Sequence, residues 1–365
     1  MTTRYLSTAL PVALLAFAFS WPAHTQAQGN LPTAQSTAQP ATTPAAAIEA
    51  PIHTLTLDVV AAHKSQPPVA DLAPSAFTLL DNKTPRPITS CKAFSGDNTP
   101  VSVTLVIDAV NTNFSNLSGA RGQIDAFLKA NSGHLAHPTR IAIFTDTRFV
   151  VQPTYTRDGN ALADWFDQQA LGLRDIRRSS GFYGADERTQ LSLNALSGLA
   201  QNELKIAGRK LVLWVSPGWP LLSGPGVELD SKQSKSIFHE VVELSSLLRD
   251  ARITVYSVDP VGAAESVGRA LDYEQYTDGL RKFTQADLGD LALQVLAVQS
   301  GGQAFSGSND VGGMIKSAYE EGSAYYELTF EPTPAEHPDE YHQIEVKVNQ
   351  PGLTVRTRQG YYNQP

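Results

Sequence analysis

The middle of the chain alternates between short apolar runs and longer segments whose apolar residues recur every three or four positions. The apolar runs are rich in β-branched residues and predict buried strands over 101–108, 140–146, 210–216 and 252–259. The longer segments predict amphipathic helices over 118–131, 158–170, 189–204, 234–251 and 286–301. This alternation predicts an α/β fold with a doubly wound, mostly parallel sheet that helices cover on both faces.

Two stretches with a two-residue alternation flank this unit. Residues 52–98 and 323–365 alternate between apolar and polar positions, which indicates antiparallel strands. Either stretch alone would leave sheet edges and an apolar face uncovered. We therefore expect both to pack together as a small β-sandwich, with an α/β domain over residues 99–322 inserted between them.

The start of the chain lacks such patterns. Residues 1–27 combine a basic Arg4, a short apolar stretch and small residues near Ala23 and Ala27, which is typical of a secretory signal peptide. A retained anchor is the alternative. Residues 28–51 are rich in Pro, Ala, Thr and Gln and predict a disordered linker. We therefore expect an exported chain (periplasmic, cell-surface or extracellular) with no membrane span after signal removal.

Composition and charge narrow the class of partner. The formal net charge is −8, and loss of residues 1–27 would remove one positive charge, Arg4, and bring it to −9. An acidic chain is a poor match for nucleic acid or an anionic membrane surface, so we expect a protein or cell-surface ligand. The one cysteine, Cys91, excludes an internal disulfide, so core packing must hold the fold together.

Polar residues stand at the carboxyl ends of the predicted strands, where open α/β sheets hold their ligands. They are Asp108, Asp146, Ser216 and Asp259. The order of the elements, with a strand that ends in Asp108, resembles a von Willebrand factor type A domain. More narrowly, residues 52–363 are similar to exported bacterial proteins of the acidobacterial type described as von Willebrand factor A-related. The likeness includes the motifs SGGQAF, YHQIEVKV and GLTVRTRQGYY.

The resemblance implies a metal-ion-dependent adhesion site with an Asp-x-Ser-x-Ser loop, a Thr from a second loop and a later Asp. Asp108 matches the first Asp, Thr112 the second hydroxyl and Thr189 the loop Thr. Val110 stands in place of the first Ser, however, and Pro217 in place of the later Asp. Mg²⁺ usually needs carboxylate charge to stay bound. We therefore expect a degenerate site with vestigial positions, no resident metal and no other cofactor.

Asp108 has an ordinary structural use in that case. An Asp at a strand-to-helix turn caps the adjoining loop or the first turn of the helix, which is predicted near Ser118. Asn111 or Asp146 would complete a weak Mg²⁺ or Ca²⁺ site only if their side chains turned into the same space. We favour the capping role and keep weak ion binding as the alternative.

Three segments at the carboxyl end of the sheet are candidates for ligand contacts. They are the loop after Asp108, an arginine-rich insert at 171–188 and a Gly/Pro-rich loop at 216–229, and they carry residue types enriched in binding hot spots. The predicted contact residues are Asp108, Asn111, Thr112, Asn113, Arg177, Arg178, Phe182, Tyr183 and Trp219. The alternatives are a mobile insert with solvated arginines and a Trp219 that covers the sheet end.

These patterns favour an exported, non-enzymatic interaction or adhesion module that binds through loops at the carboxyl end of the central sheet. Two other classes stay open: a structural or scaffold subunit of an envelope or secretion assembly, and a hydrolase with an unrecognised site at the same sheet end. The sequence has no G-x-S-x-G elbow and no phosphate-binding loop, which disfavours the enzyme. It does not indicate the partner or the oligomeric state.

Overall fold

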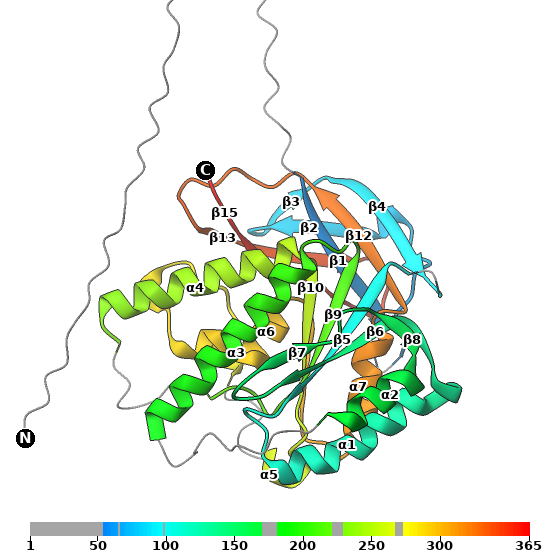
Figure 1. The fold of residues 1–365 in the computed structure, drawn as a ribbon. Coiled ribbons are helices and arrows are strands. Elements are labelled where there is room, and N and C mark those ends of the chain that lie inside the picture. Colours follow the sequence, from blue (N-terminus) through cyan, green and yellow to red (C-terminus); the bar gives the residue numbers. More distant parts are fainter. Residues whose placement is uncertain (1–53, 65, 98, 170–180, 221–228, 267–272) are drawn as a thin grey trace, which may run out of the picture. The chain divides into compact units, whose positions relative to one another are not determined.

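The computed structural model describes residues 54–64, 66–97, 99–169, 181–220, 229–266 and 273–365. The predicted signal peptide (1–27) and linker (28–51) lie outside these residues. The fold described below belongs to one compact unit, Pro51–Pro365, which combines a central sheet with two four-stranded sheets (Figure 1). Within the described part, no helix is both long and apolar enough to cross a membrane.

A seven-stranded sheet forms the centre of the unit. Its strands are β5 (Val101–Asp108), β6 (His134–Phe144), β7 (Phe149–Val151), β8 (Thr156–Asp158), β9 (Arg209–Val215), β10 (Ile253–Val258) and β11 (Ala304–Phe305). Six strands run in the order β11-β10-β9-β5-β6-β7, and β8 also pairs with β6. Only β7 and β8 pair antiparallel. The predicted mostly parallel central sheet is therefore confirmed.

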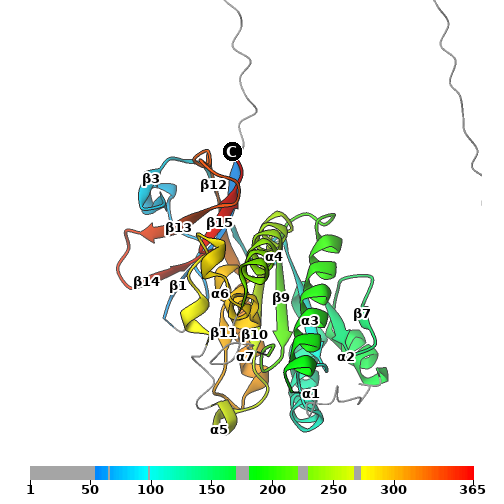
Figure 2. The ribbon, with the colours of Figure 1, turned by 90° about the vertical axis from the view of Figure 1, so that its left-hand side faces the viewer.

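Helices pack against both faces of this sheet. They are α1 (Phe114–Lys129), α2 (Gly159–Gln168), α3 (Gly181–Glu203), α4 (Ser231–Asp250), α5 (Ala263–Ser266), α6 (Leu293–Gln299) and α7 (Val311–Glu320), with 3₁₀ turns at Pro74–Ala76, Ala130–Gly133, Glu274–Tyr276, Phe283–Gln285 and Leu288–Leu291. Successive side chains of a strand point to opposite faces. Leu105 and Ile107 of β5 therefore join a core with α1, α2 and α7, whereas Val106 joins a core with α3, α4 and α6. Figure 2 shows α3 beside α4.

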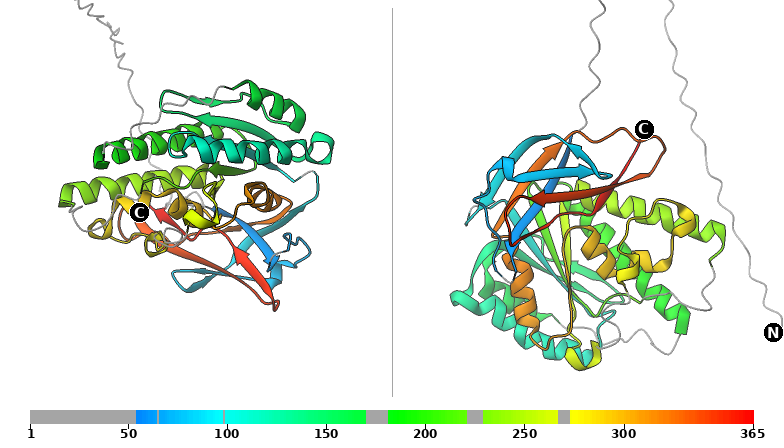
Figure 3. Two further views of the ribbon diagram at one scale, coloured as in Figure 1. Left: turned by 90° about the horizontal axis from the view of Figure 1, so that it is seen from below. Right: turned by 180° about the vertical axis from the view of Figure 1, so that it is seen from behind.

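Two antiparallel sheets flank the α/β part. They contain β1 (Leu55–His63), β2 (Phe77–Asp81), β3 (Thr84–Arg86), β4 (Ile88–Ser95), β12 (Ala324–Phe330), β13 (Glu340–Val348), β14 (Leu353–Arg356) and β15 (Gly360–Asn363), in the orders β14-β1-β12-β4 and β15-β13-β2-β3. Each sheet combines strands from both ends of the unit, coloured blue to cyan and orange to red in Figure 3. Leu57, Tyr326 and Phe330 contribute to the apolar core of these sheets. The predicted flanking antiparallel strands are therefore present.

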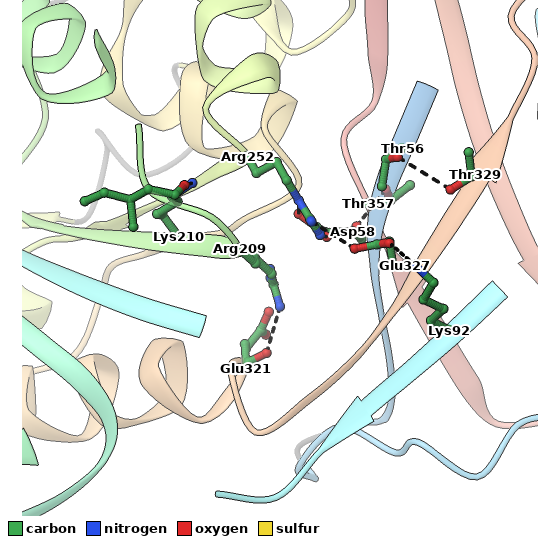
Figure 4. Close-up of polar contacts among 11 residues, drawn as sticks. Thr56, Asp58, Lys92, Arg209, Lys210, Arg252, Glu321, Glu327, Thr329 and Thr357 are labelled. Carbon is green, nitrogen blue, oxygen red and sulfur yellow. Dashed lines mark hydrogen bonds and ion pairs between the residues drawn. The ribbon is translucent and has the colours of Figure 1, made fainter. Parts of the chain in front are cut away.

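Polar contacts connect these strands to the α/β part (Figure 4). Arg252, in the turn before β10, donates to Asp58 of β1 and lies 2.8 Å from Glu327 of β12. Arg209, the first residue of β9, donates from Nη1 to the carbonyl oxygen of Glu321 at 3.0 Å. These contacts hold the antiparallel strands against the amino ends of β9 and β10, which leaves the carboxyl ends of the same strands for other uses.

Candidate functional site

A buried cluster of side chains occupies the carboxyl edge of the central sheet. Asp108 ends β5 and is fully buried, and the strand order reverses between β5 and its neighbour β9. Open α/β sheets bind ligands in the crevice at such a reversal. Here the crevice contains side chains of the chain itself, namely Asp108, Asn111, Ser192, Trp214 and Ser216, which we call the Asp108 cluster.

Neutral donors surround the Asp108 carboxylate. Its Oδ1 accepts from the backbone N–H groups of Val110 and Asn111, both at 2.9 Å. Its Oδ2 accepts from Nδ2 of Asn111 and Nε1 of Trp214, again both at 2.9 Å. Two carboxylate oxygens offer about four lone-pair positions. These four bonds therefore use the acceptor capacity of the group.

Burial and hydrogen bonding act on this carboxyl in opposite directions. Burial raises the pKa of Asp108, because the charged form loses its hydration, and hydrogen bonds from Asn111, Trp214 and Ser216 counteract the rise. The net result is a pKa above the usual range of an aspartate. The neutral dipoles thus offset part of the cost of burying the charged carboxylate, and burial remains the larger effect.

The loop after β5 turns directly into α1. Asn113 is the N-cap of that helix, and its side-chain oxygen accepts from the backbone N–H of Asn116 at 2.8 Å. The helix begins at Phe114, one turn earlier than the start predicted near Ser118, because Asn113 provides the cap. Asp108 caps the loop itself through Val110 and Asn111, and the capping role favoured from sequence describes its contacts.

The residues at this edge do not fit a divalent-ion site. The Val110 side chain lies in the apolar core beneath α3 and α4, where the adhesion-site pattern places a ligating Ser. The only carboxylate of the pattern, Asp108, already accepts four hydrogen bonds. No group of three or more His, Cys, Asp or Glu side chains in the described ranges is placed to hold a metal ion.

The two vestigial hydroxyl positions are both buried. The Thr189 hydroxyl donates to the carbonyl oxygen of Ala185 at 3.1 Å, within α3. The Thr112 hydroxyl has no hydrogen-bond partner among the residues that the structure describes. A buried hydroxyl without a partner is costly, and a water or a weakly held ion would satisfy it. Thr112 is thus the one vestigial position with unused bonding capacity.

The predicted contact residues separate into interior and surface positions. Asp108, Asn111 and Thr112 are interior, so these side chains shape the loop instead of presenting atoms to a ligand. Trp219 is also buried, because its ring packs against Trp214 with centroids 5.4 Å apart. This is a correction: Trp219 covers the sheet end and does not form the surface contact that we expected.

The arginine-rich insert is described only in its second half. Arg177 and Arg178 lie outside the described residues, and so does the side chain of Phe182. From Gly181 onward the insert belongs to α3, not to a loop. Tyr183, in the first turn of this helix, is 83% exposed.

Two residues that matter at this edge were missed from sequence. Ser192 accepts from Nδ2 of Asn111 at 2.9 Å, and Trp214 donates to Asp108. Both contacts depend on how α3 and β9 pack, which no local pattern reveals. Phe114, at the end of the loop after Asp108 that was predicted to contact a ligand, is 55% exposed at the start of α1.

The bond between Asn111 and Ser192 fixes α3 against the sheet edge. Tyr183 precedes Ser192 by nine residues in the same helix. At 1.5 Å per residue, the helix carries Tyr183 about 13 Å along its axis from the Asp108 cluster. Phe114 and Tyr183 thus begin two helices at the carboxyl edge with exposed aromatic side chains.

Comparison with protein-family models gives no match, and no curated protein matches the chain. Similar solved structures include human COPII-coat protein Sec24c (9% identity, TM-score 0.32, 75% of this chain and 46% of that one). Manganese-loaded TRAP protein of Plasmodium vivax has 10% identity and a TM-score of 0.34, over 74% of this chain and 96% of that one. Pilus adhesin SpaC of Lactobacillus rhamnosus GG has 9% identity and a TM-score of 0.34, over 81% of this chain and 49% of that one.

The chain therefore spans about half the length of Sec24c and SpaC. At such low TM-scores and identities, these similarities do not decide the fold family or the function. The resemblance to the von Willebrand factor A-related proteins stays a prediction from the sequence motifs. What is plain is a mixed α/β unit with a mostly parallel central sheet and flanking antiparallel sheets.

Proposed function

We propose that this chain is an exported, non-enzymatic interaction or adhesion module of the von Willebrand factor A-related type. It binds a protein or cell-surface ligand through the carboxyl edge of its central sheet. The observation that carries the proposal is the pair of exposed aromatic side chains, Phe114 and Tyr183, at the starts of two helices at that edge. Aromatic residues on rigid elements dominate the binding energy of many protein interfaces.

The Asp108 cluster supports binding without a metal bridge. Its carboxylate bonds to Val110, Asn111 and Trp214, so it offers little to an ion or to a carboxylate of a ligand. Recognition would then rest on apolar contacts of the two aromatic rings, surrounded by polar groups of the first turn of α1, a composition typical of protein interfaces.

The same cluster argues against the hydrolase alternative. Ser216 is the hydroxyl nearest the end of β9, but it is fully buried, accepts from the backbone N–H of Gly218 at 3.3 Å and bonds to Asp108. A serine nucleophile needs an exposed oxygen and an adjacent base. Ser216 therefore serves the packing of the sheet end.

Site-specific photo-crosslinking tests the proposal. A photoreactive phenylalanine analogue replaces Tyr183, and the matched control carries it at Leu204, which is 48% exposed directly after the other end of α3. Incubation with cell-surface fractions should give a covalent adduct from position 183 and none from position 204. Equal labelling at both positions would argue against the carboxyl edge as the binding surface.

A capture experiment with soluble variants completes the test. Phe114→Ser combined with Tyr183→Ser should weaken capture of the crosslinked partner about 30-fold or more, the effect of losing one binding hot spot. Leu204→Ser should leave it unchanged. Capture that survives the double variant would favour the scaffold alternative, in which the edge has no ligand.

A further inference from the structure

Among the described strands that end a sheet, β4 is the longest. It is the last strand in the order β14-β1-β12-β4 and has 8 residues, Ile88–Ser95. The strands at the other sheet ends are β3, β7, β11, β14 and β15, which have only two to four residues each. A short edge strand offers little to pair with, whereas a long one presents a row of free backbone groups. Within the described chain, β4 is therefore the best place for a further strand to join the fold.

The register of β4 against β12 shows which backbone groups face away from that pair. Ser95 lies opposite Ala324, and the next residue, Gly96, donates its backbone N–H to the carbonyl oxygen of Ser323 at 3.2 Å. In an antiparallel pair, every second residue bonds to the neighbouring strand in this way. The residues whose N–H and C=O groups point away from β12 are therefore Cys91, Ala93 and Ser95.

The strand has few of the features that keep edge strands from pairing, which are prolines, charges and bulges. It contains no proline and one charged residue, Lys92, whose ammonium group lies 3.3 Å from Glu327 of its own sheet. The register against β12 shifts once, between Thr329 and Phe330, and is regular over Ser90–Ser95. These residues thus form a regular, unpaired edge, which we call the β4 edge.

We propose that the β4 edge pairs antiparallel with the β4 edge of a second copy of this chain, about a two-fold axis at Ala93. A two-fold interface joins the same patch on both copies, so the patch must be complementary to itself. An antiparallel strand pair meets this condition in its backbone bonds, because each N–H faces a C=O of the other copy. Two four-stranded sheets would then continue across the axis as one sheet.

The charge on the strand selects this axis among the possible ones. An axis at Lys92 would place the lysines of the two copies directly opposite each other, and like charges so placed are destabilising. An axis at Cys91 would bring Thr89, at the irregular start of the strand, into the pairing. The axis at Ala93 uses regular residues only and opposes Lys92 to Phe94 of the second copy, so no like charges meet. Ala93 is itself small and exposed, which suits the centre of a close strand pair.

The β4 edge is separate from the carboxyl edge of the central sheet. β4 leads into the amino end of β5, at Val101, whereas Phe114 and Tyr183 follow from the carboxyl edge. Pairing through β4 therefore leaves both carboxyl edges of the dimer free, and two binding edges on one particle raise avidity for a surface that carries several ligands. The pairing itself does not depend on the proposed ligand binding, so tests of the two proposals fail independently.

Analytical ultracentrifugation of the wild-type chain tests the association directly. One strand pair is a small interface, so we expect a weak dimer with a dissociation constant on the order of 10–100 μM. Sedimentation equilibrium across and above this range should show a reversible monomer–dimer equilibrium. A monomer at every concentration would overturn the proposal.

A proline at the axis tests whether the β4 edge carries the association. Ala93→Pro removes an N–H that points away from β12, so it breaks no bond inside the sheet but removes one interchain bond from each copy. Self-association should weaken about 10-fold or more. Ala93→Val keeps the N–H and is the matched control, which should associate like the wild type. Equal association of Ala93→Pro and the wild type would contradict pairing at this edge.

Disulfide crosslinking tests the axis and does not rely on the proline variant. Opposed Cα atoms of a hydrogen-bonded antiparallel pair lie about 5.5 Å apart, which suits a disulfide. Cys91→Ser combined with Ala93→Cys should therefore give covalent dimers when copper phenanthroline and oxygen oxidise the two thiols. Cys91→Ser combined with Ser95→Cys is the matched control, because the axis separates its two thiols by four residues of strand, about 14 Å. Crosslinking of this control at the same rate would contradict an axis at Ala93.

Discussion

Two polar clusters lie beneath α3, and they hold their carboxylates in different ways. At the carboxyl edge, Asp108 accepts from neutral donors, namely N–H groups of Val110, Asn111 and Trp214 and the hydroxyl of Ser216. Near the other end of the helix, Glu203 is fully buried and accepts from Arg140 and from the hydroxyl of Tyr155, the latter at 2.7 Å. Arg140 also donates to Thr104 at 3.1 Å and lies 4.5 Å from the centre of the Tyr155 ring.

The difference separates a surface that can meet a ligand from a structural anchor. The Arg140–Glu203 pair places two opposite charges in the interior, where the loss of either one leaves the other uncompensated. The Asp108 cluster, in contrast, holds its carboxylate with neutral donors alone. One helix thus carries an ionic anchor at one end and the exposed Tyr183 near the other.

The largest expected effect comes from breaking the ionic anchor. Arg140→Met leaves the Glu203 carboxylate buried without its cation, so the free energy of unfolding should fall by about 3–5 kcal/mol. Urea denaturation followed by circular dichroism measures this loss.

Its controls use a partner variant and a surface pair. Glu203→Gln added to Arg140→Met should recover most of the loss, because no charge is then buried. Lys129→Met breaks the solvent-exposed pair with Asp125 (2.8 Å) and should change the free energy of unfolding far less. An equal loss of stability in Lys129→Met would show that the buried Arg140–Glu203 pair stabilises the fold no more than an exposed ion pair does.

A smaller effect is expected at the neutral cluster. Asp108→Asn replaces one acceptor oxygen by an NH₂ group that faces two donors, which should cost about 2–4 kcal/mol in the same denaturation experiment. Asp164→Asn, on the exposed face of α2, should change stability by less than about 0.5 kcal/mol. If Asp108→Asn is as mild as that control, the hydrogen bonds to Asp108 do not determine the conformation of the loop.

The sequence predicted the central architecture because buried parallel strands leave a strong local signal. The apolar runs located β5, β9 and β10 to within a residue or two and found β6, which begins at His134, six residues before its predicted start, and the strand end at Asp108 indicated the edge that holds the cluster. The flanking antiparallel strands were also visible from their two-residue alternation. These features depend on side chains close together in the chain, so a single sequence suffices to find them.

The hydrogen bonds inside the Asp108 cluster could not be predicted from local sequence patterns. The bond from Trp214 to Asp108 requires the register of β9 against β5, in which Trp214 lies opposite Val106. The burial of Trp219 depends on that same tryptophan. Composition alone had suggested an exposed aromatic residue in a Gly/Pro-rich loop, and the packing of two distant segments decided otherwise.

A third buried carboxyl, that of Asp290, should make the stability of the fold depend on pH. Asp290 accepts from the backbone N–H of Asp287 at 2.8 Å, and burial raises its pKa from 3.8 to about 7. The folded state therefore binds this proton more tightly than the unfolded state does. The stabilisation is present below about pH 4 and is lost as pH rises through about 7.

We expect the free energy of unfolding to fall by about 2–3 kcal/mol between pH 4 and pH 8. This is less than the pKa shift would give in full at about 1.4 kcal/mol per pKa unit. Asp290→Asn keeps an oxygen for the Asp287 N–H and cannot ionise, so its stability curve should be flatter by that amount. Urea midpoints measured from pH 4 to pH 8 give the comparison. Parallel curves for the two chains would contradict a buried proton at Asp290.

The smallest effect is expected from divalent ions. Mg²⁺, Ca²⁺ or EDTA should each shift Tm by less than about 1 °C, because the carboxylate of the Asp108 cluster has no free acceptor position. Scanning fluorimetry at fixed ionic strength measures the shift. A dose-dependent rise in Tm that Thr112→Val removes would instead reveal a weak ion site at the Thr112 hydroxyl.

The pairing of β1 has a consequence for the order of folding. Among the described strands, β1 pairs with β12 and β14, so both of its partner strands lie far along the chain; near in sequence it has one isolated bridge, from Ala62 to Pro68. During synthesis most of β1 lacks partner strands until β12 and β14 have been made, and unpaired strand edges promote aggregation. Long-range pairing of this kind also slows folding. The protein should therefore depend on a holding chaperone during its biogenesis, and a truncation that removes β12 should leave β1 without a sheet to join.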